Sequence, residues 1–405
     1  MAGRVPLQAH GQTPFQASAV TLPFDFAHGA ERAGSDSIKW RRYAGRDVIP
    51  MWVADMDFAA PPPVLDALRA RLDHGVFGYA DPWPGVLEAV IDGIARDHGW
   101  RIQPEWLVWL PGVVTGFNVA VRTVGRPGDG VFTATPVYPP FLHAPGNFEQ
   151  RLVTTSLLRT GTRWEWDWDR SAAALADGVR LFMLCHPHNP VGRVFDRDEL
   201  GRIAELAERH DLVVCSDEIH CGLVLNPTKA HVPLAALDER IGRRTITLMA
   251  PSKTWNIPAL YCAFAIIPDG TLRARYKHAM AGIVPHVNVL GLVATEAAYR
   301  DGGPWREALL ATLRSNAARV TDAIDLLPGL ATTPVEATYL AWIDCRDFLA
   351  ARGLTGSPAA FFEQAGVGLS DGRDFGLPGF VRLNFGCPPA RLEAALERMR
   401  RAVTA

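Results

Sequence analysis

The stretch Thr247-Leu248-Met249-Ala250-Pro251-Ser252-Lys253-Thr254-Trp255-Asn256-Ile257-Pro258 holds a single lysine between two apolar runs. The second run covers residues 262–267, and both runs have the length and composition of buried strands bounded by turns. The pattern therefore predicts Lys253 at the end of a core strand, beside Ser252. Desolvation there would lower the pKa of the amine and make it a candidate nucleophile toward a carbonyl carbon. The stretch alone equally allows a surface lysine between two strands, because lysine is seldom fully buried.

The chain has 405 residues, of which 48% are hydrophobic, and a formal net charge of −2. This length indicates two or three domains, and the composition is that of a soluble globular protein. The charge balance gives no basic surplus for nucleic acid and no acidic tail. The six cysteines show no C-x-x-C spacing, and the sequence has no apolar run of about twenty residues. Residues 1–16 contain no uninterrupted apolar stretch of the length that a signal peptide needs, so none is expected. We therefore expect reduced thiols, a cytoplasmic location and no membrane partner.

Apolar strands alternate with helical patterns in the middle of the chain. Residues 130–133, 179–185 and 212–215 are apolar runs, and each leads into a polar stretch rich in turn residues. Leu200, Ile203, Leu206 and Ala207 mark a helix between the last two runs. Strands of this kind alternating with helices indicate a mostly parallel sheet that is covered on both faces.

In such a sheet, ligands bind outside the carboxyl ends of the strands. The polar and aromatic residues that follow these strands should therefore gather at one edge: Tyr138, Asn189, Asp217, His220, Ser252 and Lys253. This convergence favours the functional interpretation of Lys253. Leu110-Pro111-Gly112-Val113-Val114-Thr115-Gly116 is a glycine-bounded turn before a helical pattern, and its backbone N–H groups could bind a phosphate.

Together these groups match what pyridoxal 5′-phosphate (PLP) needs from a protein. A lysine holds the aldehyde, an acid keeps the ring nitrogen protonated, and turn N–H groups with Ser252 hold the phosphate. Each residue also has a simpler interpretation. Asp217 could cap a helix, and Arg382, inside an apolar strand, could pair with one of the chain's own acids instead of a substrate carboxylate. A metal could bind the histidines and cysteines, and the aromatic residues could be plain core residues: His188, His220, Cys185, Cys221; Trp52, Trp255, Tyr138.

Periodicity and composition divide the chain into four parts. Residues 1–35 lack periodicity and are expected to form an extended or partly disordered arm. Residues 51–285 should form the large PLP-binding domain. Residues 36–50 should join residues 286–405 in a smaller α+β domain. The elements expected outside the central strands are helices near Val64, at 86–94, at 305–327, at 358–365 and from Pro389, and strands at 338–345 and 380–385.

Several motifs together resemble fold type I PLP enzymes of the aminotransferase class I/II family, and specifically the MalY/PatB-type C–S β-lyases (cystathionine β-lyases). The resemblance runs from about Lys39 to Arg401. Its most specific pieces are Pro50-Met51-Trp52-Val53-Ala54-Asp55-Met56-Asp57-Phe58, Thr135-Pro136-Val137-Tyr138-Pro139-Pro140-Phe141, Pro187-His188-Asn189-Pro190-Val191-Gly192-Arg193-Val194, Ser216-Asp217-Glu218-Ile219-His220, Ser252-Lys253-Thr254-Trp255-Asn256-Ile257-Pro258-Ala259-Leu260 and Phe380-Val381-Arg382-Leu383-Asn384. It implies the α/β PLP-dependent transferase fold (type I), with a mostly parallel sheet in the large domain, and a homodimer with active sites at the subunit interface.

The resemblance also implies a role for each candidate residue. Lys253 would be the catalytic lysine and the covalent anchor of PLP. Asp217 would pair with the pyridine nitrogen. The remaining cofactor contacts would be Asn189 and His220 near the ring hydroxyl, Tyr138 stacked on the ring, and Val113, Val114, Ser252 and a partner subunit's Tyr79 at the phosphate. Arg382, near Ala54 and Asp55, would bind the substrate carboxylate.

Two departures from the family pattern bear on the reaction. Tyr261 stands where aminotransferases commonly carry a phosphate-binding arginine, which fits the lyase subgroup, and His186 stands where relatives often carry asparagine. The resemblance therefore implies cleavage of cystathionine or related L-cysteine S-conjugates to a thiol, pyruvate and ammonia. Three alternatives stay open: transamination between an amino acid and a 2-oxo acid, a role in binding a partner or regulator, and a metal hydrolase.

Overall fold

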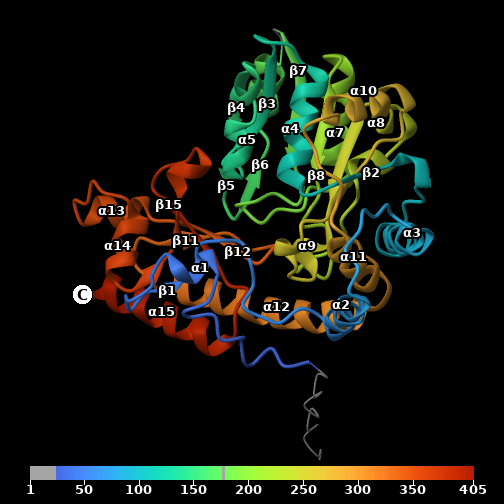
Figure 1. The fold of residues 1–405 in the computed structure, drawn as a ribbon. Coiled ribbons are helices and arrows are strands. Elements are labelled where there is room, and N and C mark those ends of the chain that lie inside the picture. Colours follow the sequence, from blue (N-terminus) through green and yellow to red (C-terminus); the bar gives the residue numbers. More distant parts are fainter. Residues whose placement is uncertain (1–23, 176–177) are drawn as a thin grey trace, which may run out of the picture.

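The computed structural model describes residues 24–175 and 178–405 (Figure 1). A seven-stranded sheet with the strand order β2-β10-β9-β8-β7-β3-β4 forms the centre of the larger part. Only β10 runs antiparallel to its neighbours in this sheet, so the sheet is mostly parallel, as predicted. Its strands are β2 (Leu107–Leu110), β3 (Gly130–Thr135), β4 (Arg151–Ser156), β7 (Val179–Cys185), β8 (Val213–Asp217), β9 (Thr245–Met249) and β10 (Ala263–Ile266).

Helices cover both faces of this sheet because alternate strand residues point to opposite sides. Leu181 and Met183 belong to the apolar cluster around α4 (Val113–Val124) and α10 (Gly270–Met280). Phe182 and Leu184 belong to the cluster around α7 (Arg197–Arg209). The continuous apolar character of β7 in the sequence therefore reflects burial on two faces.

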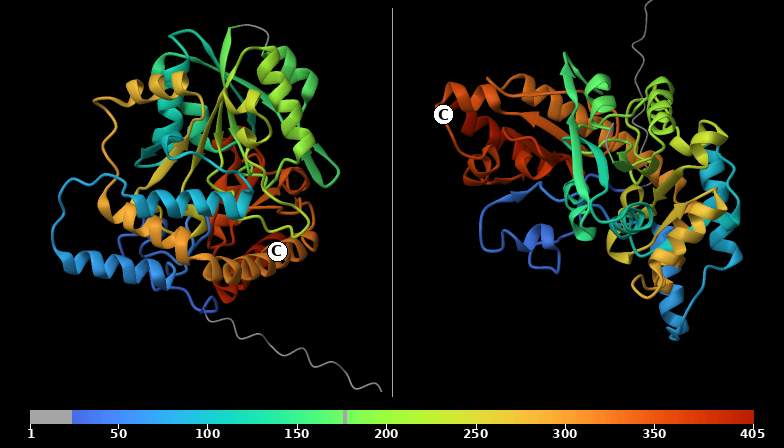
Figure 2. Two further views of the ribbon diagram at one scale, coloured as in Figure 1. Left: turned by 90° about the vertical axis from the view of Figure 1, so that its right-hand side faces the viewer. Right: turned by 90° about the horizontal axis from the view of Figure 1, so that it is seen from above.

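The C-terminal part contains a second sheet with the order β11-β12-β15-β14. Its strands are β11 (Ala331–Thr332), β12 (Leu340–Asp344), β14 (Ser370–Asp371) and β15 (Phe380–Asn384), and the long helices α12 (Gly303–Asp325) and α15 (Pro389–Thr404) pack together beside them. Residues near the N-terminus join this part, because β1 (Ile49–Pro50) pairs with β13 (Val367–Gly368). Figure 2 shows the N-terminal segment, in dark blue, beside the orange and red C-terminal elements.

The remaining elements are short or connect the two parts. Helix α11 (Val289–Asp301) packs against α2 (Pro62–His74) and α3 (Pro84–His98). The helix expected at 86–94 is α3, which ends at His98 and is followed by Gly99 in the left-handed conformation at φ +66°. The others are α1 (Ile38–Arg41), α5 (Pro139–His143), α6 (Trp168–Ala174), α8 (Glu239–Gly242), α9 (Pro251–Thr254), α13 (Arg346–Ala351), α14 (Pro358–Gln364) and the hairpin β5 (Leu158–Thr160)–β6 (Arg163–Glu165).

Two expectations need comment. Lys253 was placed at a strand end, but β9 stops at Met249 and Lys253 lies on α9, because Pro251 starts a short helix. Of the expected arm, residues 1–23 lie outside the described residues. Residues 24–35 contain no helix or strand, yet Phe26 is buried against Phe58 and Trp305.

In the part of the chain that the structure describes, no helix is long and apolar enough to cross a membrane.

Candidate active site

The predicted residues gather at the carboxyl edge of the large sheet. β2, β3, β7, β8 and β9 run in the same direction, so their carboxyl ends lie at one edge. The residues that follow these strands are Val113 and Val114 after β2, Tyr138 after β3, Asn189 after β7, His220 after β8, and Ser252 and Lys253 after β9, with Asp217 as the last residue of β8. Arg382 reaches the same place from β15 of the second sheet, since its guanidinium bonds to Asn189.

The side chain of Lys253 is held in place by a hydrogen bond to a backbone carbonyl. Its Nζ donates a hydrogen bond to Ala54 O at 2.6 Å. Burial lowers the pKa of the amine from 10.5 to about 8; the positive charge of Arg382 acts in the same direction, and the carboxylates of Asp55 and Asp217 oppose it. The lysine is therefore partly buried within the site and does not lie on the open surface. With a pKa of about 8, roughly a tenth of its amine is unprotonated at pH 7 and about half at pH 8, and this fraction is free to act as a nucleophile.

Asp217 is a buried carboxyl group at the end of β8. Its Oδ1 accepts a hydrogen bond from the backbone N–H of Ile219 at 3.1 Å, and no helix follows it. The alternative role as a helix cap is therefore wrong. Burial raises the pKa of the carboxyl group from 3.8 to about 7, against the opposing effects of the Ile219 hydrogen bond and of Lys253. A cationic partner, such as a protonated ring nitrogen, would favour the ionised form.

Arg382 lies in β15 and is buried. Its Nη2 donates to Trp52 O at 2.8 Å and to Ser370 Oγ at 3.4 Å, and its Nη1 donates to Asn189 Oδ1 at 3.1 Å. Among the described residues no carboxylate forms an ion pair with it, so the alternative of an internal salt bridge is not observed. Its Nε has no hydrogen-bond partner. Burial lowers the pKa of this guanidinium to about 10, and an anionic ligand would restore its usual range.

Two ring systems border the same space. Tyr138 precedes α5, and burial raises the pKa of its hydroxyl group; the charges of Arg382 and Asp217 also act on it. His220 is buried, and its Nδ1 has no hydrogen-bond partner. Burial, together with the positive charges of Lys253 and Arg382, lowers the pKa of His220 well below 6.5, so its imidazole is neutral.

The expected phosphate contacts are only partly assembled within one chain. Val113 and Val114 begin α4, whose N-terminal N–H groups suit an anion, and Ser252 stands beside Lys253 on α9. Tyr79 lies elsewhere, on the connection between α2 and α3, and its side chain is fully exposed. The structure therefore does not bring Tyr79 into the site of its own chain.

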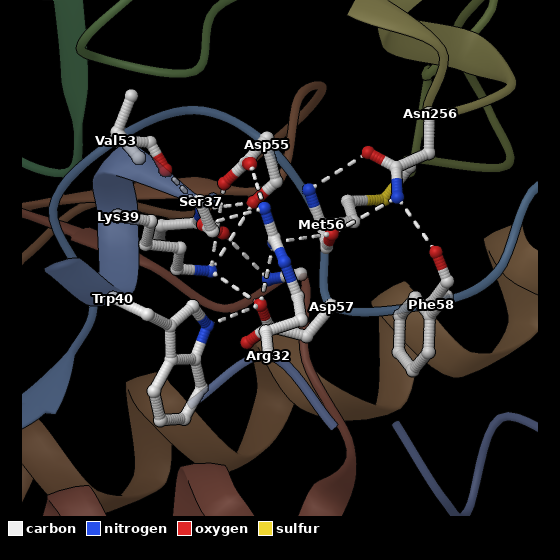
Figure 3. Close-up of polar contacts among 12 residues, drawn as sticks. Arg32, Ser37, Lys39, Trp40, Val53, Asp55, Met56, Asp57, Phe58 and Asn256 are labelled. Atoms are coloured by element: carbon white, nitrogen blue, oxygen red, sulfur yellow. Dashed lines mark hydrogen bonds and ion pairs between the residues drawn. The ribbon is translucent and has the colours of Figure 1, made fainter. Parts of the chain in front are cut away.

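Residues 52–58, which we call the active-site segment, are fixed mainly through their backbone. Ala54 O accepts hydrogen bonds from Lys253 Nζ and from the hydroxyl group of Tyr339, at 2.8 Å for the tyrosine. Asn256 Nδ2 donates to Met56 O at 2.9 Å and to Phe58 O at 2.7 Å, and its Oδ1 accepts from Met56 N at 2.9 Å (Figure 3). Because these bonds originate on several elements, the segment has one defined position beside Lys253.

Asn384 fixes the middle of the same segment. Its Nδ2 donates to Val53 O at 2.6 Å and to Asp55 O at 2.7 Å. Asn384 ends β15, the strand that also carries Arg382. Strand β15 therefore supplies the guanidinium of Arg382 and also holds the backbone of the active-site segment.

Charged side chains hold the outer part of the segment (Figure 3). The buried carboxylate of Asp57 pairs with Lys39 Nζ at 3.2 Å, Arg32 Nη1 at 2.9 Å and Arg391 Nη1 at 2.9 Å. Burial alone would raise the pKa of Asp57, but Lys39 and Arg391 lower it below 3.8. Arg32 Nη2 also donates to Asp55 Oδ2 at 2.6 Å.

Sequence reasoning assigned no role to Tyr339, Asn256, Asn384 or Arg32. Two of them carried a usable signal, because Asn256 and Asn384 are amides next to apolar runs and a buried amide needs several partners. Arg32 carried none, since it lies in a stretch without periodicity.

No histidine that the structure describes belongs to a metal site. His188 Nε2 lies 2.7 Å from Pro136 O, His186 Nε2 lies 3.2 Å from Val232 O, and His231 Nε2 lies 2.7 Å from the carboxylate of Glu218. Across residues 24–175 and 178–405, no group of three His, Cys, Asp or Glu side chains has the arrangement that a metal ion needs. The metal-hydrolase alternative therefore has no site in the described part of the chain.

The residues present fit PLP. A buried acid with a raised pKa, a partly buried lysine with a lowered pKa and a buried arginine without an acidic partner among the described residues share one edge of the sheet. A protonated pyridine ring, an aldehyde and a carboxylate are the chemical complements of the acid, the amine and the guanidinium, in that order. A helix N-terminus suited to a phosphate lies at the same edge.

Comparison with known proteins agrees with this geometry. The family model for aminotransferase class I and II matches residues 46–399. The cystathionine beta-lyase PatB of Bacillus subtilis is 36% identical, with 94% of this chain and 100% of that protein aligned. The crystal structure of OvoB has a TM-score of 0.91 at 46% identity, covering 94% of this chain and 100% of that one. Cystalysin from Treponema denticola, which contains a pyridoxal 5′-phosphate cofactor, has a TM-score of 0.89 at 32% identity, covering 94% and 99%.

Proposed function

Because this chain belongs to the aminotransferase class I and II family, we propose that it is a PLP-dependent C–S β-lyase. Its substrates are cystathionine or related L-cysteine S-conjugates, and its products are a thiol, pyruvate and ammonia. The observation that carries the proposal is Lys253, a partly buried amine whose Nζ donates to Ala54 O at 2.6 Å and whose pKa burial lowers to about 8. The similarity to a protein named cystathionine beta-lyase supports the lyase reaction over transamination.

Eight residues of this chain would hold PLP. Lys253 would bind its aldehyde, Asp217 its ring nitrogen and Tyr138 its ring face, while Asn189 and His220 would lie near the ring hydroxyl group. Val113, Val114 and Ser252 would hold the phosphate. When bound, PLP withdraws electrons from the α-carbon of an amino acid, which acidifies the Cα proton and allows a group on Cβ to leave.

The protein's own groups would then orient the substrate and move its proton. Arg382 binds the substrate carboxylate, because its guanidinium is buried and has no acidic partner among the described residues. The amine of Lys253 accepts the Cα proton, since a base of pKa near the working pH is the most effective. The carbonyl of Ala54 holds Nζ in place during this exchange.

We also propose that the active unit is a cytoplasmic homodimer in which Tyr79 completes the phosphate site of the partner subunit. The support is that Tyr79 is fully exposed and that the neighbouring Val76 and Phe77 are exposed apolar side chains. The six cysteines are free, which is typical of a reducing compartment.

The absorption spectrum and the products test this function together. The purified protein supplied with PLP should show a band near the visible edge that borohydride removes, and L-cystathionine should yield thiol and pyruvate in equal amounts. The band with amino-group transfer to a 2-oxo acid, and without pyruvate, would replace the lyase by a transaminase. Absence of the band after PLP is supplied would contradict the cofactor assignment.

A further inference from the structure

Arg32 lies against the active-site segment, although it belongs to the stretch that precedes the matched family region 46–399. Its guanidinium donates to Asp55 Oδ2 at 2.6 Å, to Asp57 Oδ1 at 2.9 Å and to Met56 O at 3.2 Å. Figure 3 shows this side chain reaching both carboxylates of the active-site segment. Arg32 is therefore fixed against the wall of the site.

Asp55 connects Arg32 to Lys253. It follows Ala54, whose carbonyl oxygen accepts the hydrogen bond from Lys253 Nζ. Arg32 compensates only one of its two carboxylate oxygens. The other, Oδ1, is buried, has no hydrogen-bond partner and lies 3.9 Å from Lys39 Nζ.

Few other charges act on the amine of Lys253. Asp217 and Arg382 face it across the site and have opposite signs, and the nearby His220 is neutral. The hydroxyl group of Tyr339 shares the carbonyl of Ala54 with the amine and adds no charge. Asp55 is therefore a negative charge near Lys253 that is compensated from outside the edge of the large sheet, by Arg32.

We propose that Arg32 is a positioning residue that sets, through Asp55, the fraction of Lys253 present as the free amine. The guanidinium holds the carboxylate in one orientation and compensates part of its negative charge. A carboxylate near a lysine favours the ammonium form, so partial compensation keeps more of the amine unprotonated. The inference rests on the proposed role of Lys253 as the reactive amine.

The direction of each change follows from this arrangement. Arg32→Ala removes the closer of the two cations beside Asp55 and leaves only Lys39, at 3.9 Å from Oδ1, so the pKa of Lys253 rises. Asp55→Asn removes the negative charge and keeps the shape of the side chain, so the pKa of Lys253 falls. If Arg32 acts through Asp55, Arg32→Ala changes nothing further once Asp55 is replaced by Asn.

Competitive acetylation of the full-length, cofactor-free protein measures this pKa directly. The protein is labelled with acetic anhydride across the pH range in which lysine titrates, and the peptide that contains Lys253 is quantified by mass spectrometry. We expect R32A to move the midpoint upward by about half a pH unit or more and D55N to move it downward by a similar amount. The double variant should titrate like D55N alone.

Matched variants separate this effect from a structural one. Arg41→Ala, an exposed arginine on α1, should leave the midpoint unchanged, and R32K, which keeps a positive charge, should lie between the wild type and R32A. If R32A does not fold, R32Q carries the same test. A folded R32A with an unchanged midpoint, or an R32A shift that persists in the D55N background, would overturn the proposal. Labelling does not depend on turnover, so a failure of the lyase assignment would leave this result standing.

Discussion

At the scale of single residues, the site is built from groups whose pKa values burial moves toward neutrality. The pKa of Lys253 falls to about 8 and that of Asp217 rises to about 7, in both cases mainly because burial disfavours the charged form. Burying such ionisable groups lowers the free energy of unfolding, and this cost is common at sites that bind a charged ligand.

Replacement of Lys253 tests the central role. Lys253→Ala should reduce pyruvate release from L-cystathionine by about three orders of magnitude or more, because both the covalent anchor and the base are lost. The band that borohydride removes should disappear as well. Lys277→Ala, on α10, is the matched control and should keep full activity. Pyruvate release by Lys253→Ala at the wild-type rate would rule out this lysine as the base.

Asp217 gives a pH-dependent prediction for the cofactor-free protein. Its pKa is higher in the folded state than in the unfolded state, so its contribution to stability is present at low pH and is lost as the pH rises through about 7. Above that pH, Asp217→Asn should stabilise the cofactor-free protein by up to about 4 kcal/mol. The same variant should release PLP readily on dialysis. Urea denaturation at several pH values measures the difference, which should shrink below the folded pKa; a constant difference would contradict it.

The residues that sequence reasoning found are charged groups inside or beside apolar runs. Arg382 lies inside such a run, Asp217 follows one and Lys253 lies between two, and a charged group in such a place needs a specific partner. Arg32 was missed because its role depends on contacts with residues more than twenty positions away and leaves no local pattern.

At the scale of elements, the active-site segment has almost no regular structure of its own. Only Ile49–Pro50 before it forms a strand. Its other hydrogen bonds come from side chains of other elements and from a few backbone groups, such as Gly386 O, which accepts from the N–H of Asp57. Its shape therefore depends on amides such as Asn256, which itself has a left-handed backbone with φ +54°.

Two variants of Asn256 separate its hydrogen bonds from its backbone conformation. Asn256→Gly keeps the left-handed conformation and loses the bonds to Met56 and Phe58, so we expect a loss of about 2–3 kcal/mol in unfolding free energy. Asn256→Ala should lose about 1 kcal/mol more, because alanine disfavours this conformation. Denaturant unfolding measures both values. As a control, replacement of the exposed Asn147 by alanine should change the free energy of unfolding little. Equal losses for the two Asn256 variants would contradict the cost assigned to the left-handed backbone conformation.

The elements with clear periodicity were predicted, and the shortest were not. Helices α3, α4 and α7 show an apolar stripe with helical spacing, so their positions follow from the sequence. Helix α9 has four residues, too few for a period, and this explains why Lys253 was assigned to a strand end. The two-residue strands β1 and β13 exist only because distant segments pair.

At the scale of the whole molecule, the two sheets meet at the site, so neither part forms it alone. The large sheet supplies Lys253 and Asp217, and β15 of the small sheet supplies Arg382 and Asn384. The sequence indicated the two-part architecture through a change of pattern after Pro285. The domain boundaries themselves remain a prediction, as does the contribution of a partner subunit.

Subunit mixing tests that contribution. Tyr79→Ala and Lys253→Ala should each have little activity alone. Denatured together in equal amounts and refolded, they should recover about a quarter of wild-type activity, because half of the dimers are mixed and each mixed dimer has one intact site. No recovery, from subunits that chromatography shows to be dimeric, would place Tyr79 in the site of its own chain or outside the site altogether.

The pairing between the two ends of the chain also governs when the site can exist during synthesis. The carbonyl of Trp52 is held by Ser370 and Arg382, and β1 has no partner until β13 has been made. Nearly the whole chain must therefore be synthesised and leave the ribosome before the active-site segment can take its position beside Lys253. Prematurely terminated polypeptides carry the lysine but not the enclosure, so they would compete poorly with the finished protein for a scarce vitamin-derived molecule.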